Sequence, residues 1–370
     1  MPTAAELHAA FDAAAPGTVG IEEELMLLDP ESWDLAPQAA EVLGRVDGDP
    51  RFKLELPAAQ LEILTSPHSE VGDAIAELRQ GRADLAAAAG ELRLAAAGLH
   101  PLAAAEGELN PGPRYEHTVA EFGAIARRQL VFALQVHVAP GGAVRGLAVY
   151  NALRSYLPEI AALAANAPFH LGCDTGLASA RPKISETLPR QGVPPPIASW
   201  EQFAADLRWG ARAGMVPFPN AWWWELRPHP RFGTLELRVP DAQTTIAEAA
   251  GIAALCQCLV VLLGERFDGG ELLATAPSWR IAENRWSALR DGVEGTLADL
   301  ESGERRPTRE RLGELIAELD PVAARLRCAT ELARAAALIE ENGAIRQRRA
   351  SAELGVEGLP QWLADRWLQE

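Results

Sequence analysis

The feature that most constrains this chain is a set of carboxylates inside segments that otherwise have the pattern of buried β-strands. The segment from Val19 to Leu28 alternates in polarity and lies between Gly and Pro residues, which is typical of a strand. Glu22 and Glu24 share one face of it, with Cβ atoms ~7 Å apart, and Glu23 faces the other way. Unpaired carboxylates are costly to bury, so these side chains are expected to meet cations.

Three further apolar segments, each expected to be a strand, carry polar side chains of the same kind. The pairs are Glu55 with Glu62 in residues 54–64, Gln135 with His137 in residues 131–138, and Glu236 with Arg238 in residues 234–239. Any one pair is most simply explained as the solvated face of a sheet. Five carboxylates and one histidine in apolar strands together predict that these groups converge on cations.

The donor atoms of this set indicate which metal they suit. Carboxylate oxygens with a single imidazole suit magnesium, or manganese, better than zinc, which favours cysteine and more histidine. Cys256 and Cys258 lie two apart in an apolar helical stretch, so core packing explains them better than metal binding. Two metals among carboxylates with arginines nearby are typical of a phosphoryl-transfer site.

The rest of the sequence predicts an α+β fold in which a mainly antiparallel sheet is surrounded by helices. Helices are expected at residues 70–97 and 151–165 and through most of the chain from about residue 246. Residues 222–227 and 234–239 have the pattern of a hairpin, and the proline-rich residues 182–196 that of a long loop. The whole chain, 1–370, is interpreted as one catalytic domain.

Charge and motifs exclude several classes of protein. The 34 basic and 51 acidic residues give a net charge of −17, which argues against a nucleic-acid-binding surface. Gly141 to Gly146 has P-loop spacing, but Leu147 stands where lysine is required, and dinucleotide, serine-hydrolase and zincin motifs are missing from the sequence. With no basic N-terminal region and no uninterrupted apolar run of membrane length, we expect no membrane partner and a cytoplasmic location.

Seven ordered motifs resemble those of the YbdK-type carboxylate–amine ligases, also called type 2 glutamate–cysteine ligases. The segments are GIEEELMLLDP, LELPAAQLEILTSP, LQVHV, ANAPFHLGCDTGLASAR, LPRQGVPP, WWWELRPHPRFGTLELRVPDAQ and ENRWSALRDG. They run from Gly17 to Gly292, and a shorter segment at residues 344–349, AIRQRR, also resembles the family. The resemblance implies a glutamine synthetase-like fold with a funnel-shaped active site. It also implies that ATP phosphorylates a carboxylate, usually the γ-carboxylate of glutamate, before an amine displaces phosphate.

The resemblance also assigns roles to individual residues. It implies one magnesium on Glu24, Glu55 and Glu62, and a second, bridging the ATP phosphates, on Glu22, His137 and Glu236. Arg238, with Arg227 as a further candidate, would stabilise the transferring phosphoryl group. Arg181 would bind the carboxylate of the acid substrate, and Arg190 either closes over a substrate or is an exposed loop residue.

Several alternatives remain open at this stage. The amine is unspecified, with cysteine as the narrower version, and no general base is identified. A small-molecule kinase and a non-catalytic nucleotide-binding regulator could use a similar site. The tryptophans Trp222 to Trp224 fit core packing better than an adenine platform, and His229 fits a turn as well as a ligand. The family resemblance suggests a homodimer or larger assembly acting on small molecules.

Overall fold

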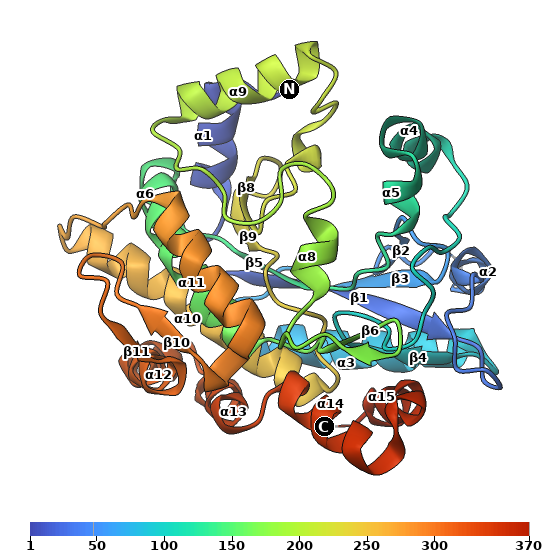
Figure 1. The fold of residues 1–370 in the computed structure, drawn as a ribbon. Coiled ribbons are helices and arrows are strands. Elements are labelled where there is room, and N and C mark those ends of the chain that lie inside the picture. The colour runs from blue at the N-terminus through green and yellow to red at the C-terminus, as the bar shows by residue number, and fades with distance from the viewer. Residues whose placement is uncertain (47, 370) are drawn as a thin grey trace.

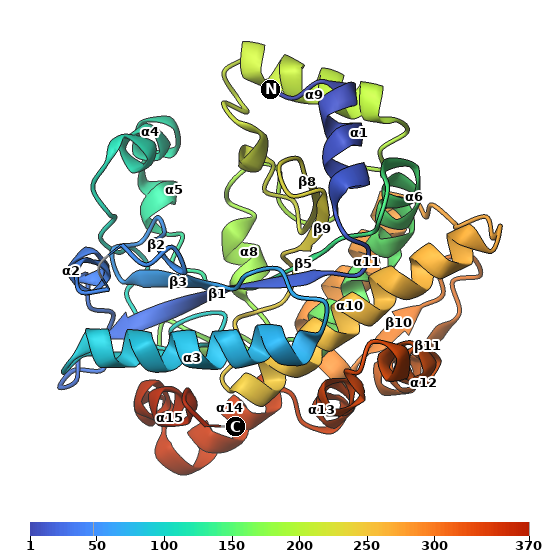
Figure 2. The same ribbon diagram turned by 180° about the vertical axis from the view of Figure 1, so that it is seen from behind.

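An antiparallel sheet crosses the centre of the molecule, with helices packed on and around it (Figures 1 and 2). The computed structural model describes residues 1–46 and 48–369. Within these residues seven strands form the sheet in the order β2–β3–β1–β5–β9–β8, and β4 also pairs with β1. The strands are β1 Val19–Leu28, β2 Phe52–Leu54, β3 Gln60–Leu64, β4 Arg93–Ala95, β5 Leu134–Val138, β8 Leu226–His229 and β9 Thr234–Leu237. This arrangement confirms the predicted α+β fold with an antiparallel sheet.

The helices account for much of the rest of the described chain, and their order along it follows the colour in Figure 1. The helices are α1 Ala4–Ala13, α2 Ala39–Gly44, α3 Val71–Ala89, α4 Pro113–Phe122, α5 Ala124–Arg127, α6 Ala143–Leu153, α7 Leu157–Leu163, α8 Arg181–Ser185, α9 Trp200–Arg212, α10 Ile246–Asp268, α11 Ser278–Asp291, α12 Thr308–Arg325, α13 Ala329–Glu340, α14 Gly343–Leu354 and α15 Leu359–Arg366. Two small hairpins, β6 Phe169–His170 with β7 Cys173–Asp174 and β10 Thr296–Ala298 with β11 Arg305–Pro307, lie outside the sheet. In both views α3 and α10 run below the sheet, while α4, α5, α8 and α9 rise above it.

The pairing register of the sheet sets polar residues of neighbouring strands opposite one another. Glu22 of β1 stands opposite Gln135 of β5, and Glu24 stands opposite Glu62 of β3. β1 changes partner along its length, because β5 pairs with its first half and β4 with its last residues. Glu24 lies at this change of partner. The two sides of β1 therefore bring carboxylates from separate parts of the chain to one face.

The helix α10 forms much of the core beneath the sheet. Its N-terminus has a capping box. The Thr245 side chain accepts a hydrogen bond from the backbone N–H of Glu248, and the Glu248 side chain accepts one from the backbone N–H of Thr245. Its 23 residues are long and apolar enough to cross a membrane by length and composition, but most of that length is buried inside the protein. Cys256 and Cys258 are both completely buried, which confirms core packing. α10 is therefore explained as the core helix of a globular fold.

Several expected boundaries were wrong for local reasons. The helix expected at 70–97 ends at Ala89, because Gly90 adopts a left-handed φ of 67° and the chain then turns back as β4. The helix expected at 151–165 is divided into α6, a short 3₁₀ turn and α7, with Pro158 in the first turn of α7. The strand expected at 54–64 is interrupted at Pro57, as anticipated, and Pro57 pairs instead with Leu109.

Three further differences affect the region around the site. The strand expected at 222–227 begins only at Leu226, so the three tryptophans precede β8 rather than alternate along it. The proline-rich segment 182–196 is not all loop, because its first residues belong to α8. The strand expected at 131–138 is shorter, beginning at Leu134. All three segments contribute residues to the lining of one cavity, and tertiary contacts decide their backbone path.

A buried ion pair fixes the opposite face of β1. Glu23 and Arg82 are fully buried, and the guanidinium binds the carboxylate with Nε–Oε2 2.9 Å and Nη2–Oε1 2.5 Å. The remaining donors of Arg82 reach the backbone oxygens of Gln243, Thr244 and Trp367. The pair therefore ties the central strand to α3 and to the C-terminal end of the chain.

Removing one member of this pair should destabilise the protein severely. Arg82→Met leaves Glu23 buried without a cation, and we expect a loss of about 3–5 kcal/mol in the free energy of unfolding by urea denaturation. The double variant Glu23→Leu/Arg82→Met should recover part of that loss. Arg306→Met, which breaks the exposed pair with Glu314, is the control and should change little. A stable single variant would contradict this account of Arg82.

Candidate active site

The first group of candidate ligands comes from three adjacent strands. Glu22, His137 and Glu236 lie on β1, β5 and β9, and each offers a ligand atom within 4.8 Å of the others. His137 Nε2 is 3.2 Å from Glu22 Oε1 and 3.9 Å from Glu236 Oε2. The other ring nitrogen, Nδ1, lies 3.0 Å from Thr234 Oγ1, which fixes the orientation of the ring. His137 Nε2 is buried and, apart from these two carboxylates, has no polar partner in the described chain, so it could serve as a metal ligand.

The charges in this group depend on one another. Burial lowers the pKa of His137, but Glu236 and Glu22 outweigh burial and raise the pKa overall. Burial raises the pKa of Glu236, but Arg227, His137 and Arg238 hold that pKa well below its usual range. Glu236 is therefore ionised, which is the form in which a carboxylate can bind a metal.

Two arginines flank this group. Arg227 forms a fork on Glu236, with Nε–Oε2 2.5 Å and Nη2–Oε1 2.9 Å. Arg238 Nη1 also donates to Glu236 Oε1 at 2.5 Å. Arg227 is almost completely buried, whereas Arg238 retains about a fifth of its side-chain surface and lines the adjoining cavity. Of these two arginines, Arg238 is the one placed to meet a ligand.

The second group of candidate ligands consists of Glu24, Glu55 and Glu62. Glu24 lies where β1 changes partner from β5 to β4. Burial and the nearby Glu55 raise the pKa of Glu24 to about 7. Burial together with Glu22, Glu55 and Glu24 raises the pKa of Glu62 well above its usual range. Carboxylates brought this close repel one another unless a cation lies between them. Among the described residues, Glu22, His137 and Glu236 have ligand atoms close enough together to hold one cation, and these donors suit magnesium or manganese. Glu24, Glu55 and Glu62 do not form such a cluster, although the repulsion between them raises the pKa of Glu24 and of Glu62.

A cavity opens beside the second group. Glu24, Glu55, Arg181 and Arg238 line it together with an apolar wall. Members of that wall are Leu56, Pro57, Val131, Leu188, Phe218 and Trp223. The helices α4 and α8, which stand above the sheet in Figure 1, both contribute residues to the lining. The cavity therefore suits a ligand that carries both charged and apolar groups.

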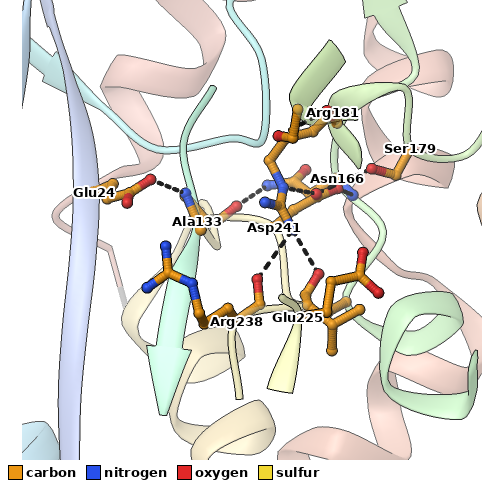
Figure 3. Close-up of polar contacts among 12 residues, drawn as sticks. Glu24, Ala133, Asn166, Ser179, Arg181, Glu225, Arg238 and Asp241 are labelled. Carbon is orange, nitrogen blue, oxygen red and sulfur yellow. Dashed lines mark hydrogen bonds and ion pairs between the residues drawn. The ribbon is translucent and has the colours of Figure 1, made fainter. Parts of the chain in front are cut away.

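Arg181 is held in place at the cavity wall by contacts within the protein. Its Nε donates to Asp241 Oδ1 at 2.7 Å and its Nη2 to the Val239 carbonyl at 2.6 Å. Asp241 also accepts from Ser179 and from the backbone of Asn166 (Figure 3). This anchoring uses two nitrogens of the guanidinium and fixes its plane.

Arg190 lies at the side of the cavity, not within the lining. It adopts a left-handed φ of 61°, donates to the Ala221 carbonyl at 3.1 Å and lies over the ring of Trp223, 5.1 Å from its centroid. Trp222 and Trp223 both pack against the hydrophobic core, and Trp223 also lines the cavity. His229 stacks on Phe232 with 4.2 Å between the ring centroids, beside His137, and burial lowers its pKa to about 4.

Sequence reasoning missed an ion-pair cluster in the cavity wall. Arg285 donates two hydrogen bonds to the Glu225 carboxylate, Nε–Oε2 at 2.6 Å and Nη2–Oε1 at 2.5 Å. Its Nη1 donates a third to Glu186 Oε1 at 2.5 Å. Glu225 and Arg285 are both buried, and both line the cavity. They lie in the WWWELR and ENRW segments, so the motif resemblance held the only signal for them. Their pairing joins α11 to the segment before β8.

Comparisons with known proteins show the family to which the chain belongs. The model of glutamate–cysteine ligase family 2 matches residues 18–358. A relative from Rubrobacter xylanophilus, with the provisional name glutamate–cysteine ligase 2-3, is 41% identical over 93% of this chain and 95% of its own. A Frankia alni relative, provisionally named glutamate–cysteine ligase 2-1, is 35% identical over 92% of each chain.

Solved structures show the same fold at much lower identity. The glutamate–cysteine ligase of Francisella tularensis, solved in complex with AMP, has a TM-score of 0.70 at 12% identity over 95% of this chain and 88% of that chain. A bifunctional glutathione synthetase from Pasteurella multocida has a TM-score of 0.67 at 14% identity, over 98% of this chain and 53% of that one. Fold and family together define an enzyme that joins a carboxylate to an amine. The chain belongs to glutamate–cysteine ligase family 2.

A variant of Glu62 tests two effects: the repulsion between this carboxylate and its neighbours, and its contribution to metal binding. The raised pKa of Glu62 means that the folded protein holds a proton more tightly than the unfolded chain, so metal-free stability falls as pH rises above the ordinary glutamate pKa. In EDTA at pH 8, we expect Glu62→Gln to melt at a higher temperature than the wild type. Addition of Mn²⁺ should stabilise the wild type by about 2–3 kcal/mol near 100 times the Kd, and the variant by less.

Differential scanning calorimetry with and without Mn²⁺ measures both effects. Glu314→Gln removes an exposed carboxylate on α12 and serves as the matched control. Equal Mn²⁺-induced shifts in the wild type and Glu62→Gln would take Glu62 out of the metal site.

Proposed function

We propose that this ligase uses ATP and magnesium, or manganese, to convert a carboxylate to an acyl phosphate, which an amine then attacks to form an amide. The observation that carries the proposal is the close approach of Glu22, His137 and Glu236 on one sheet face, with Arg238 at the adjoining cavity. Bound cations would neutralise the triphosphate and orient its terminal phosphoryl group. The AMP complex of the Francisella tularensis ligase supports adenine nucleotide use.

The protein would contribute to this reaction mainly by positioning the reacting groups and by neutralising their charge. Glu22, His137 and Glu236 would hold one cation, and Glu24, Glu55 and Glu62 the other. Arg238 would stabilise charge on the transferring phosphoryl group, because its guanidinium reaches the cavity while Glu236 holds it. Arg227 supports this arrangement by fixing Glu236.

The acid substrate would enter the cavity beside Glu24 and Arg238. Arg181 lines this cavity and is the candidate for binding a substrate carboxylate, with Asp241 fixing its orientation. Arg190 and Trp223 would close one side. We propose glutamate as the acid, reacting through its γ-carboxylate, and leave the amine unassigned, with cysteine as one candidate. We further propose a cytoplasmic homo-oligomer.

A matrix of acids and amines, assayed with ATP and Mg²⁺, tests this function directly. We expect phosphate release only when glutamate and a suitable amine are both present, with a product mass equal to the pair minus water. A phosphorylated acceptor without an amide would indicate a kinase. ATP binding without turnover in any mixture would indicate a regulator.

Glu236→Gln supplies the matching variant. The amide keeps the shape of Glu236 but loses the charge that Arg227, His137 and Arg238 all contact, so we expect turnover to fall at least ~10³-fold. Circular dichroism should show that the fold survives. Wild-type turnover in this variant would remove Glu236 from the reaction, and Glu314→Gln should retain full activity.

A further inference from the structure

We propose that Gln135 is a positioning residue that couples the two groups of candidate ligands, because it fixes the position of Arg238 relative to Glu24. The inference rests on the proposed function for its kinetic part. Gln135 lies on β5 opposite Glu22 and is buried, with 2% of its surface exposed. Its Nε2 donates to Glu24 Oε1 at 2.9 Å, and its Oε1 accepts from Arg238 Nη1 in a short hydrogen bond.

The chemistry of the amide explains why glutamine suits this position. One end must donate to a carboxylate, and the other must accept from a guanidinium, which has no acceptor atom. The orientation of the amide is therefore determined, since a flipped amide would set its NH₂ against Arg238 and its oxygen against Glu24. Because the group is buried, loss of either hydrogen bond leaves a polar partner unsatisfied.

These contacts form a continuous path across the sheet face. Arg238 donates to Glu236 as well as to Gln135, and Gln135 donates to Glu24. Glu236 belongs to the first ligand group and Glu24 to the second. Glu24 is also fixed by the backbone N–H of Ala133, at 2.7 Å (Figure 3). Gln135 is thus the side chain that sets the position of Arg238 relative to the second group.

Two substitutions test this coupling. Gln135→Met preserves length but removes both hydrogen bonds, and Gln135→Glu keeps an acceptor for Arg238 but faces Glu24 with a like charge. We expect Gln135→Met to bind Mn²⁺ about 10-fold more weakly, as for loss of other groups that orient metal ligands. Its kcat should fall about 10²-fold, with the KM for the acid changed less than about 3-fold, because Arg238 loses its alignment.

Mn²⁺ affinity is measured by electron paramagnetic resonance of free Mn²⁺ on the intact protein, independently of turnover. Gln257→Met is the matched control, because Gln257 is a fully buried glutamine on α10 that donates to Gly17 and Ser69 carbonyls. The control should lose thermal stability but keep Mn²⁺ affinity and kcat.

The outcomes separate this inference from the proposed function. Wild-type Mn²⁺ affinity and kcat in Gln135→Met would overturn the positioning role, as would a change no different from that in Gln257→Met. If the wild type lacks ATP-dependent turnover altogether, the proposed function fails. In that case weakened Mn²⁺ binding in Gln135→Met still supports the coupling of the two groups, and unchanged binding refutes it.

Discussion

The pairing of β1 with its neighbours is the constraint on which the rest of this site depends. A strand directs alternate side chains to the same face, so Glu22 and Glu24 point together only while the register holds. The partners of β1 then add His137 from β5 and Glu62 from β3, and β9 adds Glu236 beside His137. A slip of one residue would send each carboxylate into the apolar core on the other side.

This arrangement holds like charges close together, and the structure balances them unevenly. Glu236 is surrounded by cations, so its carboxylate stays ionised. Glu24 and Glu62 lie among other carboxylates, and their pKa values are raised. One group thus has its charge set by arginines and a histidine, while the other is incompletely neutralised by the protein alone. In the function we propose, a divalent cation would supply the missing charge, and cation binding and fold stability would then be linked through the same residues.

The opposite face of β1 shows how the fold tolerates this repulsion between carboxylates. Glu23 points away from the site and forms a complete ion pair with Arg82, which also holds backbone oxygens near α10 and at the C-terminal end. The strand is therefore anchored from beneath by a pair whose charges cancel. The upper face can then keep carboxylates whose charges do not cancel, because their positions are fixed by the sheet and not by their own contacts.

The two-residue period of strands predicted that Glu22 shares a face with Glu24 and Gln135 with His137, and hence that charged groups would converge on cations. The assignment of these residues to two separate metal ions came only from the resemblance of the motifs to a known family. Glu22, Glu24 and Glu23 could be assigned to faces from β1 alone. The cavity wall has no such period: Arg285 comes from α11, Glu225 from the segment before β8, and their contact depends on how separate elements pack. The same difference limited the boundaries, since Gly90 ends α3 by a backbone conformation that composition alone did not reveal. Chemistry encoded in a strand can be predicted from its spacing, whereas substrate choice, made by loops and helices from distant segments, requires the folded structure.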